Sequence, residues 1–417
     1  MSELEYIPRV ASRPDQADAA NERALSTDNK AESWLAIVAL FMVSLNLRPA
    51  VTSIAPVLES IRRDLGMNGV AASLLVSIPV LCMGLLSPLS VRFGNRLGNE
   101  KVIVWSLVLL GGSTLLRILV HTEVLLFLST LLAGIGIAIM GPLLSGFIKK
   151  HLSRSIQAMI ALYSMALSLG AALGSSLSAP FQMQLHSWQT ALSLWAILAI
   201  AAVPFWLGVL RRQTYAPTAA AALSRTSKLP WKNKKAWLLA VHFGLLAMVI
   251  YCLIGWLPLM LINAGDSALH AGLMLTVFAV IQIPSGLMLQ MLLRRFPSRL
   301  TWLIAASSMQ AIGLIFLFSS MLSWLAVLLC GFGSGVLFAL SSLLPIEAAS
   351  SPEEAASWAA MMQSVGYLMG AAGPILMGWV YDGMGQFRLG ILGMILVSLM
   401  LVVIQLFIVP RREESAS

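Results

Sequence analysis

The sequence predicts an all-α membrane protein with twelve transmembrane helices arranged in two pseudo-symmetric six-helix bundles. Hydrophobic residues make up 58% of the 417-residue chain and charged residues only 11%, and the mean hydropathy is +0.85. This composition excludes a soluble globular protein. Two further observations support the fold class. Apolar runs long enough to cross a bilayer recur along the chain, and the second half of the sequence repeats features of the first.

A helix needs about 20 apolar residues to cross a bilayer, and twelve segments satisfy this requirement. Several of them are longer, which predicts tilted helices. The six segments of the first half are 34–58, 69–90, 101–120, 123–147, 155–181 and 187–210. The six of the second half are 235–262, 268–293, 300–320, 322–347, 355–381 and 386–409.

Polar segments divide the chain into two bundles, 33–210 and 235–410. Residues 1–32 are polar, mixed in charge and without an apolar signal-peptide core, so we predict a disordered cytoplasmic tail. The longest segment between spans, 211–234, is basic and carries Pro217 and Pro230 around an Ala/Ser run. We interpret it as a flexible cytoplasmic linker, and 411–417 as a second cytoplasmic tail.

The basic residues predict the orientation. With both termini in the cytoplasm, most of the 27 Lys and Arg fall in cytoplasmic segments, and the outer loops hold only Arg62, Arg63 and Arg388. An excess of Lys and Arg on the cytoplasmic side is typical of multi-pass membrane proteins. It accounts for the net charge of +9 without a nucleic-acid partner.

Short matches relate the two halves. They share their order and a nearly constant offset of about 200 residues, which indicates an internal repeat. The matches include Trp34-Leu35 with Trp237-Leu238, Arg92-Phe93 with Arg295-Phe296, and Gly170-Ala171-Ala172 with Gly370-Ala371-Ala372. Two parallel halves around a site at the midplane are typical of transporters.

Arg48 lies in the middle of the first predicted span. An arginine near the bilayer centre costs about 2.5–3.5 kcal/mol on insertion scales, and Arg48 lies too deep to reach the interface easily. Ser44, Arg48 and Thr52 follow i, i+4, i+8 spacing and share one helix face. Pro49 frees a backbone carbonyl one turn earlier, which a membrane tolerates only beside protein or a water-filled cavity.

We therefore predict that Arg48 faces a central aqueous cavity and binds an anionic or strongly polar solute, with Ser44 and Thr52 on the same face. The alternative interpretation is a structural arginine, held between helices by backbone carbonyls.

The loop 91–101 resembles the signature that the major facilitator superfamily carries between its second and third helices. Arg96, Gly98 and Lys101 match that signature, whereas Val91 replaces its leading Gly and Asn95 its Asp. The resemblance covers about residues 33–410 and assigns Arg96, Gly98 and Lys101 to a gating loop. The missing Asp argues against a charged acidic latch there.

The stretch Leu45-Asn46-Leu47-Arg48-Pro49 narrows the resemblance. It is similar to the first helix of the cyanate permease and 2-nitroimidazole transporter branch of that superfamily. The resemblance implies secondary active transport of a small anionic or nitro-bearing solute, such as cyanate, by alternating access around Arg48. It also implies the bacterial cytoplasmic (inner) membrane as the location.

In the resembled fold, spans 1, 4, 7 and 10 line the cavity, with help from spans 2, 5, 8 and 11. Tyr251 is the strongest candidate beside Arg48, because the repeat offset places it opposite that residue. Each central polar or aromatic residue either contacts the solute or makes an interhelical hydrogen bond. The candidates are Tyr163, Tyr251, Trp256, Gln282, Gln363 and Tyr367.

Titratable residues are rare in the spans, and no Asp or Glu lies near a span centre. His242 is therefore the candidate for coupling to a proton, because the ordinary pKa of histidine is about 6.5. The alternative is a histidine that packs and hydrogen-bonds between helices, which we consider the better interpretation. We expect no cofactor and no metal, and we expect the protein to act as a monomer in the lipid bilayer.

Other functions have less support. The sequence shows no Ser/His/Asp constellation, no central carboxylate pair and no His/Cys cluster, so we do not expect an enzyme or a catalytic residue. A multidrug or toxic-compound efflux pump of the same fold is the main alternative to import of a small anion. A membrane receptor that does not transport is a minor one.

Overall fold

The computed structural model describes residues 34–151, 156–213, 229–296, 298–320, 322–348 and 352–408, and every regular element in these ranges is helical. The predicted tails 1–32 and 411–417 and most of the predicted linker lie outside them. Within these ranges, eleven helices have a stretch long and apolar enough to cross a membrane. The remaining long helix, α14 (Pro352–Met384), has 33 residues and falls outside that set. Together they form the twelve long helical units that the sequence predicts.

The first half consists of six such units, three of which contain a break or a change of helix type. The elements are helix 34–46, α2 (Pro49–Thr52), η1 (Ala55–Val57), α3 (Leu58–Leu65), α4 (Gly69–Leu97), α5 (Asn99–Leu116), η2 (Arg117–Leu119), α6 (Glu123–His151), α7 (Ile156–Leu185), α8 (Trp188–Ser193) and α9 (Ala196–Gln213). The first unit, predicted as one bent helix, is interrupted twice, and the sixth is divided into α8 and α9.

The second half consists of six long helices. They are α10 (Lys234–Asn263), α11 (Ala268–Arg295), α12 (Arg299–Phe318), α13 (Ser323–Ala348), α14 and α15 (Arg388–Ile408). Polar side chains fix where several of them begin. Asn233 caps α10, Ser267 caps α11 and Ser298 caps α12, each by accepting a backbone N–H of the first turn. These caps satisfy donors that would otherwise lie unpaired at the end of an apolar helix.

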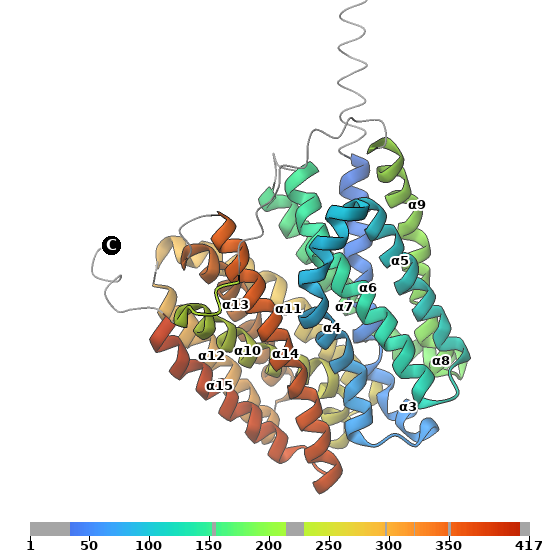
Figure 1. The fold of residues 1–417 in the computed structure, drawn as a ribbon. Helices are drawn as coiled ribbons and strands as arrows, with labels where there is room; N and C mark the ends of the chain where they lie inside the picture. Colours follow the sequence, from blue (N-terminus) through green and yellow to red (C-terminus); the bar gives the residue numbers. More distant parts are fainter. Residues whose placement is uncertain are drawn as a thin grey trace, which may run out of the picture.

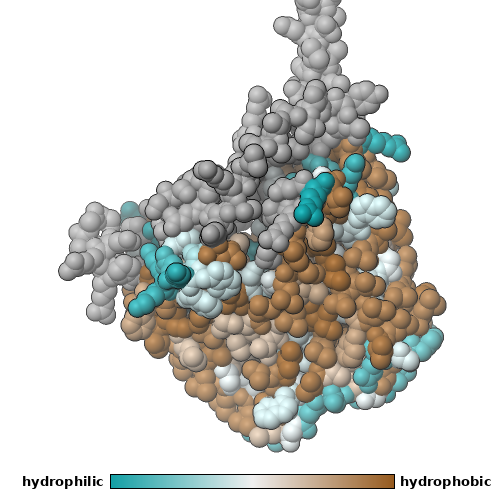
Figure 2. Space-filling model, in the orientation of Figure 1, coloured by the Kyte–Doolittle hydropathy of each residue, from teal (hydrophilic) through white to brown (hydrophobic). Residues whose placement is uncertain are grey.

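Burial distinguishes central helices from peripheral ones. In α10, 89% of the apolar stretch is buried, whereas in α15 only 33% is. Hydrophobic side chains cover most of the face seen in Figure 2, and hydrophilic ones gather along its lower right edge. A broad apolar belt with polar margins is the surface expected of a protein that spans a bilayer.

The two halves lie side by side (Figure 1), and two helix pairs make the most extensive contacts between them. In the first pair, α4 packs against α14, and Gly84 lies against Leu368 and the Ser364 carbonyl. In the second pair, α7 packs against α11, and the hydroxyls of Ser175 and Thr276 lie 2.7 Å apart. Small residues and hydroxyls at such contacts allow helix backbones to approach closely within a membrane.

Candidate functional site

The first helical unit is interrupted at Arg48. Helix 34–46 ends at Asn46, Leu47 and Arg48 form a turn, and the one-turn helix α2 starts at Pro49. Because proline has no N–H, the Leu45 carbonyl loses the donor that a continuous helix would supply. A second interruption at residues 53–54 separates α2 from η1. Arg48 therefore lies at a break in the helix, where the regular helical hydrogen bonding of the backbone is interrupted.

Neighbouring helices hold this break closely. The Asn46 amide donates to the Met42 carbonyl at 2.7 Å and to the Leu198 carbonyl of α9 at 3.0 Å. On the other side, α7 presents Gly170, where an added Cβ would overlap the Leu45 carbonyl oxygen. One turn later, a Cβ at Gly174 would lie 2.6 Å from the Thr52 hydroxyl oxygen. Only glycine at these two positions lets α7 approach the break so closely.

Arg48 itself is half-buried. Three tyrosine hydroxyls lie within the electrostatic range of its guanidinium, those of Tyr163 on α7, Tyr251 on α10 and Tyr367 on α14. Among the residues that the structure describes, no carboxylate pairs with it and no backbone carbonyl accepts a hydrogen bond from it. The site thus combines one unpaired positive charge with three phenols.

The three tyrosines come from both halves, and the two of the second half contact each other. The rings of Tyr251 and Tyr367 meet edge to face, with centroids 6.2 Å apart. Phe243 packs edge to face on the far side of Tyr367, at 5.3 Å. The Tyr251 hydroxyl lies 3.9 Å from the Met83 sulfur on α4. A solute next to Arg48 would therefore contact helices of both halves.

One end of the molecule is closed by contacts between α14 and the start of α4, and we refer to it as the outer end, following the predicted orientation. The Asp382 carboxylate accepts the backbone N–H groups of Gly69 and Val70. An added Cβ at Gly378 would overlap the Gly69 carbonyl, so the two backbones touch. The Arg62 guanidinium lies 4.9 Å from the centre of the Tyr381 ring. Asp382 thus caps a helix of the opposite half.

The sequence model of the Major Facilitator Superfamily matches residues 35–374. The chain belongs to the major facilitator superfamily. It is therefore a secondary transporter and a multi-pass membrane protein, and the prediction that it is not an enzyme is confirmed. Solved structures agree on the fold. A crystal structure of the nucleoside transporter NupG has 14% sequence identity and a TM-score of 0.72, covering 90% of this chain and 100% of that one.

Three relatives cover most of this superfamily member. An uncharacterized transporter, YycB of Bacillus subtilis (strain 168), is 32% identical over 85% of this chain and 88% of its own length. The 2-nitroimidazole transporter of Escherichia coli (strain K12) is 30% identical over 88% of this chain and 93% of its own length. The cyanate transport protein CynX of the same strain is 29% identical over 66% of this chain and 71% of its own length. The predicted membership in this branch is confirmed as a distant relationship.

Four other predicted residues make hydrogen bonds within the protein. The Ser44 hydroxyl donates to the Leu40 carbonyl, and the Thr52 hydroxyl to the Arg48 carbonyl. The Trp256 indole, almost fully buried, donates to the Pro374 carbonyl at 3.1 Å. The Gln282 amide donates to the Phe278 carbonyl of its own helix. Gln363 is exposed, one turn before Tyr367 on α14. Their roles in solute binding stay predictions.

His242 is fully buried within the second half, at a junction of four helices. Its Nδ1 lies 3.3 Å from the Ser341 hydroxyl of α13, and its Nε2 lies 3.1 Å from the Gln405 amide nitrogen of α15. The same amide donates to the Ser307 hydroxyl of α12 at 2.7 Å. Both ring nitrogens are thus engaged by neutral groups, and a role in proton coupling stays a prediction.

The superfamily signature forms the corner between α4 and α5. Gly98 has a φ of +89°, a conformation that strains any residue with a side chain, which explains why glycine occupies this position. Arg96 and Lys101 are exposed on either side of the corner. The gating role of these three residues stays a prediction.

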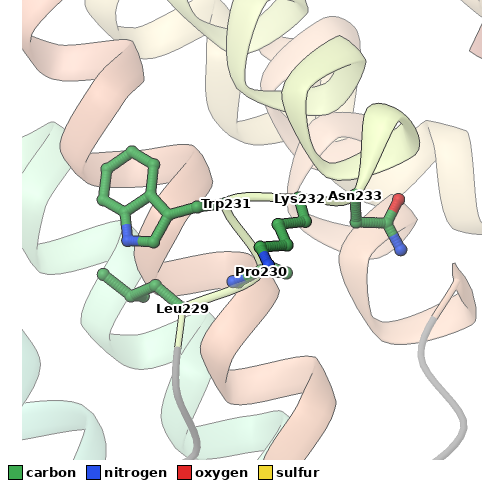
Figure 3. A pocket seen from close by; sticks show the side chains of 5 residues that line it. All are labelled: Leu229, Pro230, Trp231, Lys232 and Asn233. Carbon is green, nitrogen blue, oxygen red and sulfur yellow. The ribbon is translucent and has the colours of Figure 1, made fainter.

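A hollow of about 740 Å³ lies before the start of α10 (Figure 3). The described residues that line it are Leu229, Pro230, Trp231, Lys232 and Asn233. None of them is a predicted site residue. The Trp231 ring packs against that of Trp237, with centroids 5.8 Å apart, and the Trp237 indole donates to the Trp231 carbonyl. This hollow therefore does not belong to the site predicted at Arg48.

Sequence reasoning missed two charged residues. Asp382 lies near a span end, and no sequence motif indicates that it caps α4. Arg117 falls inside a predicted span, and its buried charge was the one available signal. It is fully buried, and its Nη2 donates to the Ala50 carbonyl of α2 at 2.9 Å.

Proposed function

We propose that this transporter moves a small anionic or nitro-bearing solute, such as cyanate, across the bacterial inner membrane by alternating access around Arg48. The observation that carries the proposal is the guanidinium of Arg48, which lies at a helix break without a partner among the described residues, with three tyrosines from both halves within its electrostatic range. A half-buried charge without a partner costs free energy unless a ligand or water satisfies it. An anionic solute would do so.

The surrounding groups favour a small planar solute with oxygen or nitrogen acceptors. Charge-assisted hydrogen bonds to a guanidinium are worth about 1.5–3 kcal/mol net. The hydroxyls of Tyr163, Tyr251 and Tyr367 can donate to further acceptor atoms. Their rings, together with Phe243, supply faces and edges against which a flat solute packs. The names of two relatives, a 2-nitroimidazole transporter and a cyanate transport protein, support this solute class.

Alternating access follows from the position of the site between the halves. The contacts of Asp382 with α4 and of Ser175 with Thr276 join the halves toward the outer end, and that of Gly84 with Leu368 joins them near the middle of α4. We infer an inward-facing state, with both termini in the cytoplasm. Opening of the outer end would require these contacts to break while the solute keeps Arg48 and the tyrosines of both halves together.

Flux into liposomes tests the proposal. Purified protein is reconstituted into ATP-free liposomes, and uptake of labelled cyanate and of 2-nitroimidazole is measured under imposed pH, sodium and solute gradients. We expect saturable uptake of at least one probe by the wild type. The Arg48→Ala variant should need about tenfold more solute for half-maximal uptake, since about 1.4 kcal/mol corresponds to tenfold in affinity.

Arg48→Lys should recover only part of the loss, because lysine keeps the charge without the planar fork. Thermal unfolding of each variant serves as the control for folding. A well-folded Arg48→Ala variant with wild-type flux and half-saturation would contradict the proposal, and so would strict dependence on internal ATP.

A further inference from the structure

Arg117 is a buried charge that the proposed site does not use directly. It lies in η2 at the end of α5, fully buried, and its Nη2 donates to the Ala50 carbonyl at 2.9 Å. Its Nε and Nη1 have no hydrogen-bond partner among the residues that the structure describes. Burial of a guanidinium with so few partners is unfavourable. The hydrogen bond to the Ala50 carbonyl is therefore the one described polar contact that offsets this cost.

The carbonyl that Arg117 binds belongs to the broken part of the first helical unit. In a continuous helix, the Ala50 carbonyl would accept the Ile54 N–H. Here the Ile54 N–H bonds to the Val51 carbonyl instead, at 3.3 Å. Arg117 thus replaces a helical donor that the second interruption removes, and it stabilises that interruption.

Helix α2 is a single turn between the two interruptions, and Arg48 is attached to it. The Arg48 carbonyl accepts the backbone N–H groups of Val51 and Thr52 at 3.0 Å and the Thr52 hydroxyl at 3.1 Å. Arg48 and α2 therefore form one hydrogen-bonded unit. This unit is held by the glycines of α7 on one side and by Arg117 on another. A shift of Ala50 would move Arg48 with it.

We propose that Arg117 is a positioning residue for solute binding. By holding the Ala50 carbonyl, its guanidinium fixes the orientation of α2, and thereby the place of the Arg48 guanidinium relative to the three tyrosines. The inference rests on the proposed function of Arg48 in solute binding. It adds a second arginine that acts through the backbone and does not touch the solute.

The first test compares the Arg117→Met and Arg117→Lys variants in the liposome flux assay with cyanate and 2-nitroimidazole. Displacement of a binding group by about 1 Å can cost up to 100-fold, so we expect Arg117→Met to raise the half-saturating concentration about tenfold. Lysine retains one donor and should recover part of the loss. The matched control is Leu303→Ala, which removes fully buried apolar atoms in α12 of the other half. It should lower stability without changing half-saturation.

A double variant separates positioning from direct contact. If Arg117 acts through Arg48, the Arg48→Ala/Arg117→Met variant should bind like Arg48→Ala alone. Independent losses that multiply would overturn the inference, and so would normal half-saturation in a folded Arg117→Met variant. Should the Met variant not fold, Arg117→Lys decides. A half-saturating concentration above that of the wild type in the Lys variant, together with a double Arg48→Ala/Arg117→Lys variant equal to Arg48→Ala, supports positioning, whereas wild-type half-saturation or multiplied losses contradict it.

A readout without solute keeps this inference separate from the proposed function. In a chain whose native cysteines are replaced, Arg48→Cys is labelled with a small charged methanethiosulfonate reagent, with and without Arg117→Met. Positioning predicts that the labelling rate changes at least about threefold when Arg117 is removed, because the side chain at position 48 moves. Leu303→Ala should leave the rate unchanged. An unchanged rate with Arg117→Met would overturn the inference even if Arg48 binds solute.

Discussion

Two arginines meet one short helix in this transporter, and they differ in what they contact. Arg48 precedes α2 and is half-buried, and we propose that its guanidinium binds solute, whereas Arg117 is fully buried and donates to a carbonyl within α2. Both charges lie inside membrane-spanning segments, where an unused charge would be costly. The two arginines therefore differ in their proposed roles, one in binding solute and the other in holding the backbone of α2.

His242 provides a prediction about a single residue. Replacement by leucine would leave the Ser341 hydroxyl and the Gln405 amide without one of their partners in the buried network. We expect His242→Leu to lower the free energy of unfolding by about 1–3 kcal/mol. The dependence of flux on an imposed pH gradient should stay as in the wild type. The measurement combines thermal unfolding with flux at several pH gradients.

The control for this variant is His121→Leu, because His121 is exposed in a loop. Its effect on unfolding should stay within about 0.5 kcal/mol. Loss of the response to pH in a well-folded His242→Leu variant would show that His242 couples transport to protons.

Single residues differed in how well the sequence predicted them. Arg48 could be selected as a candidate, because a central arginine followed by proline is rare in a membrane span, and its role stays a prediction. Tyr163, Tyr251 and Tyr367 could be selected by their depth alone, and all three lie within the electrostatic range of Arg48. The role of Arg117 could not be predicted, because its partner is a backbone carbonyl. Every residue has such a carbonyl, so the sequence does not indicate which one an arginine binds.

At the scale of elements, the interruptions of the first helical unit are the main departure from prediction. Pro49 predicts the first interruption, because proline removes a helical hydrogen bond. The second interruption, at residues 53–54, involves a rearranged hydrogen bond of Ile54 and the reach of Arg117 from α5. It depends on a tertiary contact across 67 residues of sequence, which no local pattern reveals.

The contact of α7 with the break yields a second prediction. Gly170→Ala would place a Cβ against the Leu45 carbonyl, which belongs to the backbone and cannot rotate away. We expect lower stability and weaker solute binding, because α7 and the break must separate. The control is Gly112→Ala in α5, where a Cβ meets nothing within 4 Å. That change should stabilise the helix by about 0.5–1 kcal/mol. Equal unfolding temperatures for the two variants would contradict the prediction.

The cap of Asp382 on α4 yields a third prediction. A carboxylate at a helix N-terminus is worth about 0.3–1 kcal/mol at an exposed position. Asp382→Asn should therefore favour opening of the outer end by about two- to fivefold. The measurement is labelling of a Met83→Cys probe, in a chain without other cysteines, by an impermeant thiol reagent added outside. Asp382→Glu, which keeps the charge, should react more slowly than Asp382→Asn. An unchanged labelling rate in Asp382→Asn would exclude a role in closing this end.

At the scale of the whole molecule, the repeat and the apolar spans were sufficient to predict twelve helices in two halves. The face that each polar residue presents was harder to predict. A serine or glutamine in a membrane helix can satisfy itself on a carbonyl one turn earlier, as Ser44 and Gln282 do. The sequence pattern of such a residue does not differ from that of one that lines a cavity.

The orientation of the whole molecule is a prediction that labelling can test. In a background where Cys82, Cys252 and Cys330 are replaced, an impermeant thiol reagent added outside intact cells should label Asp266→Cys and spare Arg225→Cys. After permeabilisation both should react. The reason is the concentration of Lys and Arg in the segments assigned to the cytoplasm. The reverse labelling pattern would refute the proposed topology.

The glycines and polar residues within α14 have a consequence for how the protein is made. Among the described residues, eleven helices have a stretch long and apolar enough to cross a membrane, and α14 falls outside that set. Its five glycines and the polar Gln363 lower its hydropathy, and such a segment partitions less readily from the translocon into lipid. We therefore expect α14 to insert stably only after α10 and α4, the helices against which it packs, are already in the membrane. Assembly of the second half would then be ordered in time, with its last crossings completed against a preformed first half.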